Sequence, residues 1–124
     1  MTWKRTKGVK YSNKKVEHSG YSFASKLEAA LFDHLKLREK AGFIRDLQVQ
    51  DTVYLTDARI IYKPDFKFFN LESHVHEWAE SKGFETSDWR IKRRLWECYG
   101  PGKLWIYAGT ATKLVLKEVL QGAA

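Results

Sequence analysis

Cysteine and proline are scarce in this chain of 124 residues, which contains one cysteine and two prolines. Because Cys98 has no second cysteine to pair with, an intramolecular disulfide is excluded, and so is a metal site built from cysteines alone. A chain without disulfides suits a reducing compartment. We therefore expect a cytoplasmic protein.

Long hydrophobic runs are also absent. Residues 1 to 20 contain no apolar stretch typical of a signal sequence, and no segment approaches the length that spans a bilayer. No internal repeat, low-complexity segment or long linker divides the chain. With 44% hydrophobic residues the chain can form one core, but it is too short for two. We expect an N-terminal arm at residues 1–20, a single domain at residues 21–124, and no association with a membrane.

Acidic residues are too few to balance the basic ones, since 22 Lys and Arg stand against 15 Asp and Glu and give a formal net charge of +7. Such an excess favours a polyanionic partner, of which nucleic acid is the commonest. A ribosomal protein or a protein of the membrane surface would share this balance. Composition therefore indicates the charge of the partner and leaves its identity open.

The basic excess is concentrated at the N-terminus, where no acidic residue precedes Glu17. Segments of this kind are either frayed, solvated ends or contacts to phosphate groups. Trp3 and Tyr11 favour contact, because aromatic side chains among basic ones can stack on bases. The predicted DNA-binding residues of the arm are Lys4, Arg5, Lys7, Lys10, Lys14 and Lys15.

A helix is predicted from Ser22 to Lys40, where apolar residues recur every three or four positions until Gly42 ends the pattern. Ser25 and Glu28 fit a capping box, in which the Glu28 side chain reaches back to a backbone N–H at the helix start. That structural interpretation of Glu28 competes with a catalytic one. The predicted apolar stripe consists of Ala24, Leu27, Leu31, Phe32, Leu35 and Ala41.

Three strands are predicted after this helix. "LQVQDTVYL" alternates polar and apolar residues, "ARIIYKPDFKFF" is aromatic and β-branched, and "HVHEWAESK" returns after a turn at residues 70–73. Pro64 cannot donate a hydrogen bond to a ladder, so we expect it at an edge, a bulge or a point where strands diverge. His74 and His76 are expected to be exposed, because nothing spaced for a zinc site accompanies them.

A second helix is predicted in "TSDWRIKRRLWECYG", with Thr86 or Ser87 as its cap. Its predicted apolar face consists of Ile91, Leu95 and Cys98 or Tyr99, and its predicted DNA-binding residues are Arg90, Lys92, Arg93 and Arg94. "KLWIYAG" follows as a buried strand, and "ATKLVLKEVLQ" is predicted to be a final helix. The predicted fold class is α/β, with the core order helix, three strands, helix, strand and a mixed sheet flanked by helices.

Asp65 and Glu80 are unexpected in such apolar strands, since buried carboxylates are costly unless they are paired or hold a metal. If the second and third strands pair across the turn, both carboxylates lie near one end of the sheet. Glu80 and Lys82 would then point to one side and Ser81 to the other. Two carboxylates offer hard oxygen ligands for Mg²⁺, and a lysine beside them would stabilise charge on a phosphate. The alternatives are a turn at Pro64 and a solvated ion pair.

Five segments together resemble a known family. They are "YSNKK", "FASKLEAALFDHLKLREKAGFIRDLQVQ", "YKPDF", "ESKG" and "TSDWRIKRRLW", and they follow the family's order between Tyr11 and Tyr107. On these segments the chain resembles short phage proteins that form a domain family of unknown function within the PD-(D/E)XK nuclease superfamily. It is more distantly similar to bacteriophage endonuclease I, a Holliday-junction resolvase. The resemblance implies a PD-(D/E)XK (restriction-endonuclease-like) core.

The resemblance also implies a role for each residue of the site. Asp65 and Glu80 would be metal ligands and Lys82 the catalytic lysine, with Glu28 as a further ligand or an acid that positions water. The supporting groups would be Gln50 and the backbone carbonyl of Ser81. The family often has Asp where this chain has Glu80, although the superfamily pattern allows either.

These implications favour one function and leave alternatives open. We expect an enzyme, a Mg²⁺-dependent endodeoxyribonuclease that also accepts Mn²⁺ and that selects branched DNA such as a Holliday junction. Paired symmetric cuts would favour a homodimer. The alternatives are a nickase or restriction-like nuclease, and a non-catalytic nucleic-acid-binding module with a nuclease fold. The resemblance places the expected cytoplasm in a bacterium or a phage-infected host cell.

Overall fold

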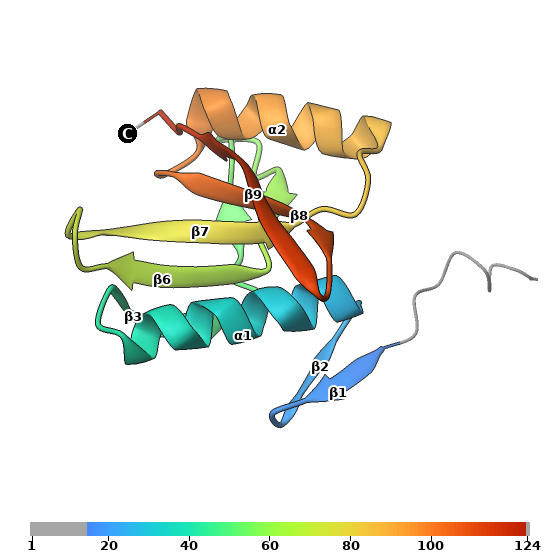
Figure 1. The fold of residues 1–124 in the computed structure, drawn as a ribbon. Helices are drawn as coiled ribbons and strands as arrows, with labels where there is room; N and C mark the ends of the chain where they lie inside the picture. The colour runs from blue at the N-terminus through green and yellow to red at the C-terminus, as the bar shows by residue number, and fades with distance from the viewer. Residues whose placement is uncertain (1–14, 124) are drawn as a thin grey trace, which may run out of the picture.

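Residues 15–123 are described by a computed structural model, whose course is shown in Figure 1. A five-stranded sheet in the order β3-β6-β7-β8-β9 lies between helices α1 and α2. The predicted α/β class with a sheet flanked by helices is thus confirmed. The elements are β1 (Val16–His18), β2 (Tyr21–Phe23), α1 (Lys26–Lys40), β3 (Ile44–Val49), β4 (Val53–Tyr54), β5 (Ile61–Tyr62), β6 (Phe66–Asn70), β7 (Val75–Ser81), α2 (Ser87–Tyr99), β8 (Leu104–Thr110) and β9 (Lys113–Leu120).

The sheet is mixed, as predicted. β6 runs antiparallel to both β3 and β7, β7 runs parallel to β8, and β8 runs antiparallel to β9. The parallel pair arises because α2 carries the chain from the end of β7 back to the start of β8, which a short turn could not do. Within residues 15–123, no helix is long and apolar enough to cross a membrane.

α1 is capped by Ser25, whose Oγ accepts a hydrogen bond from the Glu28 backbone N–H at 3.1 Å. The predicted start at Ser22 is wrong, because Ser22 pairs with Glu17 in the β1–β2 hairpin, whose turn contains the predicted arm boundary at residue 20. Gly42 ends the helix with a φ of 88°, which favours glycine. Of the predicted stripe, Leu31, Phe32 and Leu35 are buried, Leu27 is half-buried, and Ala24 and Ala41 are exposed.

α2 covers the other face of the sheet and is capped by Thr86, as predicted. Its apolar face differs from the prediction, because Trp89 and Trp96 are the residues buried against the sheet. Tyr62 of β5 packs between them, with ring centroids 6.0 and 5.9 Å away, and this contact sets the rotation of the helix. Of the predicted face, Leu95 is half-buried and Ile91, Cys98 and Tyr99 are exposed.

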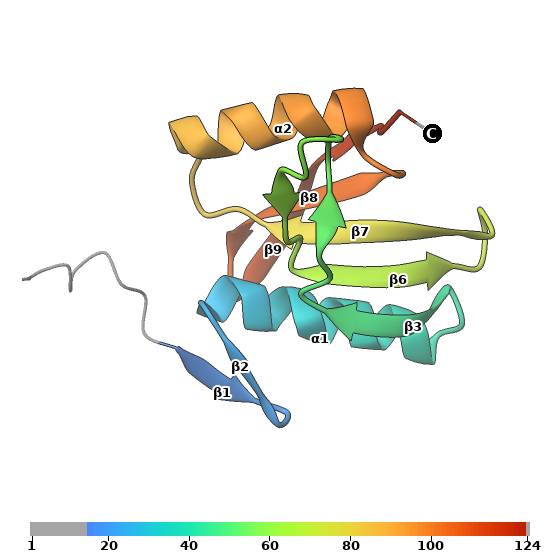
Figure 2. The same ribbon diagram turned by 180° about the vertical axis from the view of Figure 1, so that it is seen from behind.

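The two strands predicted before residue 70 are each broken in two. "LQVQDTVYL" divides between β3 and β4, and "ARIIYKPDFKFF" divides between β5 and β6 at Pro64. Gln50 turns the chain out of the main sheet with a φ of 56°, and its N–H donates to the Asp65 carbonyl at 2.8 Å. β4 and β5 therefore form a separate hairpin that reaches α2 (Figure 2). Pro64 lies where strands diverge, as predicted.

The prediction of a helix in "ATKLVLKEVLQ" is wrong, because this segment forms the edge strand β9. Gly109 has a φ of 95°, and a Cβ there would lie 2.2 Å from the Lys113 carbonyl oxygen, so the tight turn after β8 requires glycine. The Lys113 N–H also donates to the Thr110 hydroxyl at 3.1 Å. The turn brings the segment onto the open edge of β8, and the ladder hydrogen bonds outweigh its helical spacing.

Candidate active site

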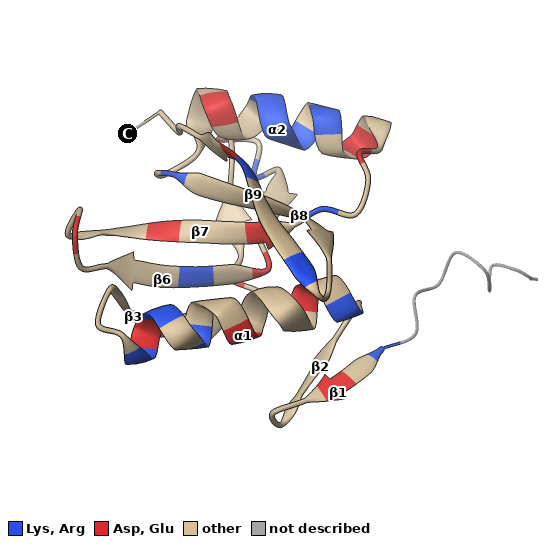
Figure 3. Cartoon of the chain, in the orientation of Figure 1, with Lys and Arg blue, Asp and Glu red and all other residues tan. Residues whose placement is uncertain are grey.

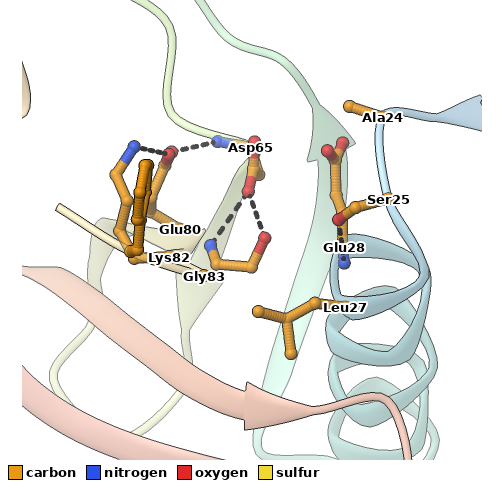
Figure 4. A pocket seen from close by; sticks show the side chains of 10 residues that line it. Ala24, Ser25, Leu27, Glu28, Asp65, Glu80, Lys82 and Gly83 are labelled. Atoms are coloured by element: carbon orange, nitrogen blue, oxygen red, sulfur yellow. Dashed lines mark hydrogen bonds and ion pairs between the residues drawn. The ribbon is translucent and has the colours of Figure 1, made fainter. Parts of the chain in front are cut away.

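A cavity of about 670 Å³ opens where β6 begins and β7 ends, beside the first turn of α1 (Figure 4). Asp65 directly precedes β6, Glu80 is the penultimate residue of β7, Lys82 follows β7, and Glu28 projects from α1. All four line the cavity. The expectation that β6 and β7 deliver two carboxylates to one end of the sheet is therefore confirmed.

The two strand ends hold each other's carboxylates in place. Glu80 Oε1 accepts a hydrogen bond from the Asp65 backbone N–H at 3.1 Å. Asp65 Oδ2 accepts from both the backbone N–H and the hydroxyl of Ser81, each at 2.9 Å. These bonds cross from one strand to the other, so the position of each carboxylate is fixed by the β6–β7 pairing.

Lys82 is held on two sides. Its Nζ lies 2.9 Å from Glu80 Oε2 and 4.6 Å from the centroid of the buried Trp89 ring. Its backbone N–H donates to the Tyr107 carbonyl at 2.8 Å, which extends the pairing of β7 and β8 by one residue. Glu80 and Lys82 therefore share one side while Ser81 contacts Asp65, as alternation predicts.

Three carboxyl groups in this cavity resist ionisation. Burial, together with the negative charge of Asp65, raises the pKa of Glu28 to about 7 and that of Glu80 to about 7. Burial also raises the pKa of Asp65, although the hydrogen bonds from Ser81 and the charge of Lys82 oppose this shift. One lysine does not neutralise three carboxylates, so the cavity favours the uptake of further positive charge, either protons or a cation.

Glu28 combines a helix-capping position with an unsatisfied carboxylate. The Ser25 hydroxyl accepts from the Glu28 backbone N–H, and the backbone N–H of Ala24 lies near the Glu28 carboxylate and partly offsets the rise of its pKa, as the predicted capping box requires. Glu28 is only 4% exposed, and its Oε2 is buried without a hydrogen-bond partner. A capping role alone does not explain such a group, because a buried, unpaired carboxylate oxygen is destabilising.

The chain matches the family model described as "Protein of unknown function (DUF1064)" over residues 8–108. It belongs to this family. The match includes Glu28, Asp65, Glu80 and Lys82 and ends within β8, so the whole cavity lies inside the DUF1064 domain and β9 lies outside it. No match to this chain is found among curated proteins.

The donor set of the DUF1064 cavity suits a hard cation. Among residues 15–123 no three His, Cys, Asp or Glu side chains are already arranged to hold a metal ion. The unpartnered oxygen of Glu28 and the raised pKa values of Glu28 and Glu80 nevertheless fit Mg²⁺, which prefers carboxylate oxygens and water. Lys82 already pairs with Glu80 Oε2, so a cation at that oxygen would compete with the lysine.

The two supporting residues expected from the sequence occupy different places. Gln50 is exposed and is not part of the cavity lining, and it supports the site only through its backbone bond to Asp65. Ser81 lines the cavity and orients Asp65 through its hydroxyl as well as its backbone. Sequence reasoning missed this hydroxyl and the Trp89 ring under Lys82. Strand alternation could have indicated Ser81, whereas Trp89 lies on another element.

The Lys and Arg positions of α2 are blue in Figure 3, and only two of the four predicted DNA-binding residues of this helix are exposed. Arg90 and Arg94 are exposed and four residues apart, so they lie on the same face of the helix. Arg93 instead binds Glu118 of β9 through both of its terminal nitrogens, and Lys92 donates to a backbone carbonyl of β5 at 2.7 Å. Arg93 and Lys92 thus hold neighbouring elements together.

Most of the net charge comes from the N-terminal arm. Lys and Arg outnumber Asp and Glu by seven, and five of these cations lie within residues 1–14. Five predicted DNA-binding residues of the arm therefore lie outside the described residues: Lys4, Arg5, Lys7, Lys10 and Lys14. The sixth, Lys15, is described and exposed.

Proposed function

We propose that this DUF1064 protein is a Mg²⁺-dependent DNA endonuclease with a PD-(D/E)XK core that selects branched DNA. One observation carries the proposal: Asp65 and Glu80 converge from two paired strands on one cavity with Lys82 and Glu28, and burial raises the pKa of all three carboxyls. Perturbed carboxyl groups gathered in a cavity are typical of catalytic sites.

The order of elements around the cavity supports the same proposal. A helix, three strands of the main sheet, a second helix and a strand follow one another as α1, β3, β6, β7, α2 and β8. This is the core order that the resemblance to PD-(D/E)XK nucleases implies. The Pro-Asp pair lies where β5 and β6 diverge, and the Glu-x-Lys motif lies at the end of β7.

Asp65, Glu80 and the backbone carbonyl of Ser81 would hold Mg²⁺, with Glu28 beside them in the cavity. When bound, Mg²⁺ acts as a Lewis acid on the phosphodiester and neutralises part of its charge, and Mn²⁺ would substitute for it. Ser81 keeps Asp65 oriented toward the cavity through its two hydrogen bonds. Lys82, once separated from Glu80, would place its ammonium to stabilise negative charge on the scissile phosphate.

Glu28 is suited to proton transfer. Its pKa of about 7, which results from burial and from the charge of Asp65, leaves it partly ionised at neutral pH. A carboxylate with such a pKa accepts a proton more readily than an exposed glutamate does. We propose that Glu28 positions the attacking water and accepts its proton.

DNA would be held mainly through its phosphates. Arg90, Arg94 and the basic residues of the arm would supply positive charge for phosphate contacts. Phosphate contacts carry no sequence information, which suits recognition of DNA shape. Resolution of a four-way junction requires two symmetric cuts and therefore two active sites. We propose that a homodimer makes these cuts.

A cleavage assay tests the proposed function. Labelled linear, flapped and four-way DNA are incubated with the purified protein in EDTA, Ca²⁺, Mg²⁺ and Mn²⁺. We expect cuts in Mg²⁺ and Mn²⁺, mainly near the branch point, and none in EDTA. The matched control is Glu72→Gln, which changes an exposed glutamate outside the cavity and should cut like the wild type, whereas Glu80→Gln should not cut.

Binding without cleavage would contradict the proposal. If the wild type binds branched DNA but cuts none of the substrates in either metal, the protein is a nucleic-acid-binding module with a nuclease-like fold. If it cuts linear duplex as fast as branched DNA, the endonuclease assignment stands and the substrate class is wrong.

A further inference from the structure

Phe84 is the most exposed large hydrophobic residue of residues 15–123, with 78% of its surface accessible. It lies in the segment that links the end of β7 to the start of α2. It also lines the same cavity as Asp65 and Glu80. A lone exposed apolar residue needs no explanation elsewhere on a surface, but this one borders a cavity lined by carboxylates.

The segment that carries Phe84 is anchored on both sides. Before it, the Lys82 backbone N–H donates to the Tyr107 carbonyl of β8 at 2.8 Å. After it, Glu85 pairs with Lys117 of β9 at 2.8 Å, and Thr86 caps α2 through its hydroxyl. Phe84 is thus presented to solvent by a short, tethered segment, which lowers the entropy lost when the ring contacts a ligand.

The chemistry of the ring restricts what it can bind. A phenyl group offers no hydrogen bond to a phosphate, and it gains free energy mainly by covering another apolar or planar surface. The planar, apolar surfaces of DNA are the faces of its bases. Within a continuous duplex both faces of each base are covered by its neighbours, so a face becomes available only where the stack is interrupted.

We propose that Phe84 stacks on an unstacked base next to the scissile phosphate. The substrate class is then DNA with an interrupted base stack, such as a flap, a branch point or a single-stranded gap. This inference rests on the proposed function, because that function places the phosphate in the neighbouring cavity. It assigns the selection of branched DNA to one residue, whereas Arg90 and Arg94 grip any phosphate backbone alike.

Fluorescence of 2-aminopurine tests the contact without requiring cleavage. The probe is placed at the unpaired position of flapped DNA and titrated with protein in Ca²⁺. Stacking on Phe84 should quench the probe, and Phe84→Ala should abolish the quenching. Because stacking on an aromatic side chain contributes about 1–3 kcal/mol per base, flapped DNA should bind about 5- to 150-fold more weakly to this variant. Binding to continuous duplex should change less than about twofold.

Three further variants separate stacking from general apolar contact. Phe84→Leu keeps an apolar side chain without a flat ring and should lose nearly as much affinity as Phe84→Ala, whereas Phe84→Trp should keep the quenching. Phe43→Ala is the matched control, because Phe43 is 55% exposed and does not line the cavity. It should behave like the wild type. Unchanged thermal melting would show that all four variants are folded.

The results distinguish this inference from the proposed function. The stacking role is wrong, while the nuclease assignment stands, if Phe84→Ala binds and cuts every substrate as the wild type does. The same holds if this variant loses equal affinity for duplex and flapped DNA. If Phe84 quenches the probe but the wild type cuts nothing in Mg²⁺ or Mn²⁺, the stacking role stands and the nuclease assignment is wrong.

Discussion

Two buried glutamates lie three residues apart on β7 and have opposite surroundings. Glu77 is 1% exposed and accepts hydrogen bonds, each at 2.9 Å, from Asn70, Ser73 and the Trp105 indole. Glu80 is 6% exposed and faces Asp65 and Glu28, and burial together with the charge of Asp65 raises its pKa to about 7. The strand is the same, but Glu77 accepts hydrogen bonds from three neutral donors, whereas Glu80 pairs with Lys82 and shares its cavity with two other carboxyl groups.

The difference is the one expected between a structural carboxylate and a carboxylate of the proposed site. Donors around Glu77 replace the water that it loses on folding, so its burial is compensated within the protein. Glu80 has one lysine and one backbone N–H for partners, and two further acids nearby. Such a group costs stability that only a proton or a cation can recover. Replacing Glu77 should therefore lower stability, and replacing Glu80 should lower the proposed activity.

The largest expected effect is on cleavage. Asp65→Ala and Glu80→Ala should each lower the cleavage rate at least about a thousandfold, which corresponds to about 4 kcal/mol of activation free energy, because each removes a proposed metal ligand. DNA binding in Ca²⁺ or EDTA should persist, since phosphate contacts supply it. If either variant cuts at a near-wild-type rate in Mg²⁺, the assignment of that residue as a metal ligand is wrong.

The reciprocal change at Glu77 should affect folding. Glu77→Ala leaves the donors of Asn70, Ser73 and Trp105 without their acceptor, so the free energy of unfolding should fall by about 3 kcal/mol. Glu80→Ala at pH 8 should change it by less than about 1 kcal/mol, because the lost hydrogen bonds are offset by removal of a buried charge. Urea titrations of both variants measure this contrast, and equal losses would contradict it.

Glu28→Gln separates capping from catalysis. The cap bond uses the Glu28 backbone N–H and the Ser25 hydroxyl, so the substitution leaves it intact and the variant should fold. Loss of the ionisable group should lower the cleavage rate about 100-fold, or about 2.7 kcal/mol. Melting and cleavage are measured on the same sample. A folded variant with full activity would show that Glu28 has a structural role at the helix cap and no catalytic role.

Stability without metal should fall as pH rises from about 5 to about 7. The folded pKa of Glu28 and Glu80 is about 7 against an ordinary value of 4.5, so in this window the folded state binds more protons than the unfolded one. Both groups contribute to this loss, which is complete once the pH has passed their folded pKa of about 7. Burial of His34 lowers its pKa and opposes this trend. The decisive comparison is therefore with Glu28→Gln, whose free energy of unfolding should fall less steeply between pH 5 and pH 7 than that of the wild type.

Added Mg²⁺ should stabilise the protein to an extent that depends on pH. A cation replaces the protons that Glu28 and Glu80 bind, so Mg²⁺ should raise the melting temperature more at pH 8 than at pH 5.5. Glu80→Ala should abolish the difference. An equal rise at both pH values would indicate that Mg²⁺ acts elsewhere on the protein.

The smallest effect is expected on the salt dependence of DNA binding. Replacing Arg90 and Arg94 together with Ala should flatten the slope of log K against log salt by about one to two units, since each neutralised phosphate contributes about 0.9 on duplex DNA. Arg93→Ala is the matched control, because its partner is Glu118. It should leave the slope unchanged and lower the free energy of unfolding by about 1 kcal/mol. A double variant with an unchanged slope would mean that this face of α2 does not meet DNA.

Local sequence predicted the elements whose signals are contained in a few neighbouring residues. Gly42 marks the end of α1, Thr86 marks the start of α2, and alternation placed Glu80 and Lys82 on one side of their strand. Pro64 predicted a divergence of strands, because proline lacks the N–H that a ladder requires. Each of these features is decided by backbone hydrogen bonding over one turn or one strand.

Contacts between distant segments decided the rest. β9 is a strand because the Gly109 turn folds it onto the edge of β8, and the buried face of α2 follows Trp89 and Trp96 because Tyr62 of a separate hairpin packs against them. The Arg93–Glu118 pair and the raised pKa values in the cavity likewise depend on residues far apart in the chain. The sequence thus determined which residues are candidates for the proposed chemistry. Only the tertiary structure decided which carboxylates are left without donors, because burial and the distance between charges exist only once the strands have paired.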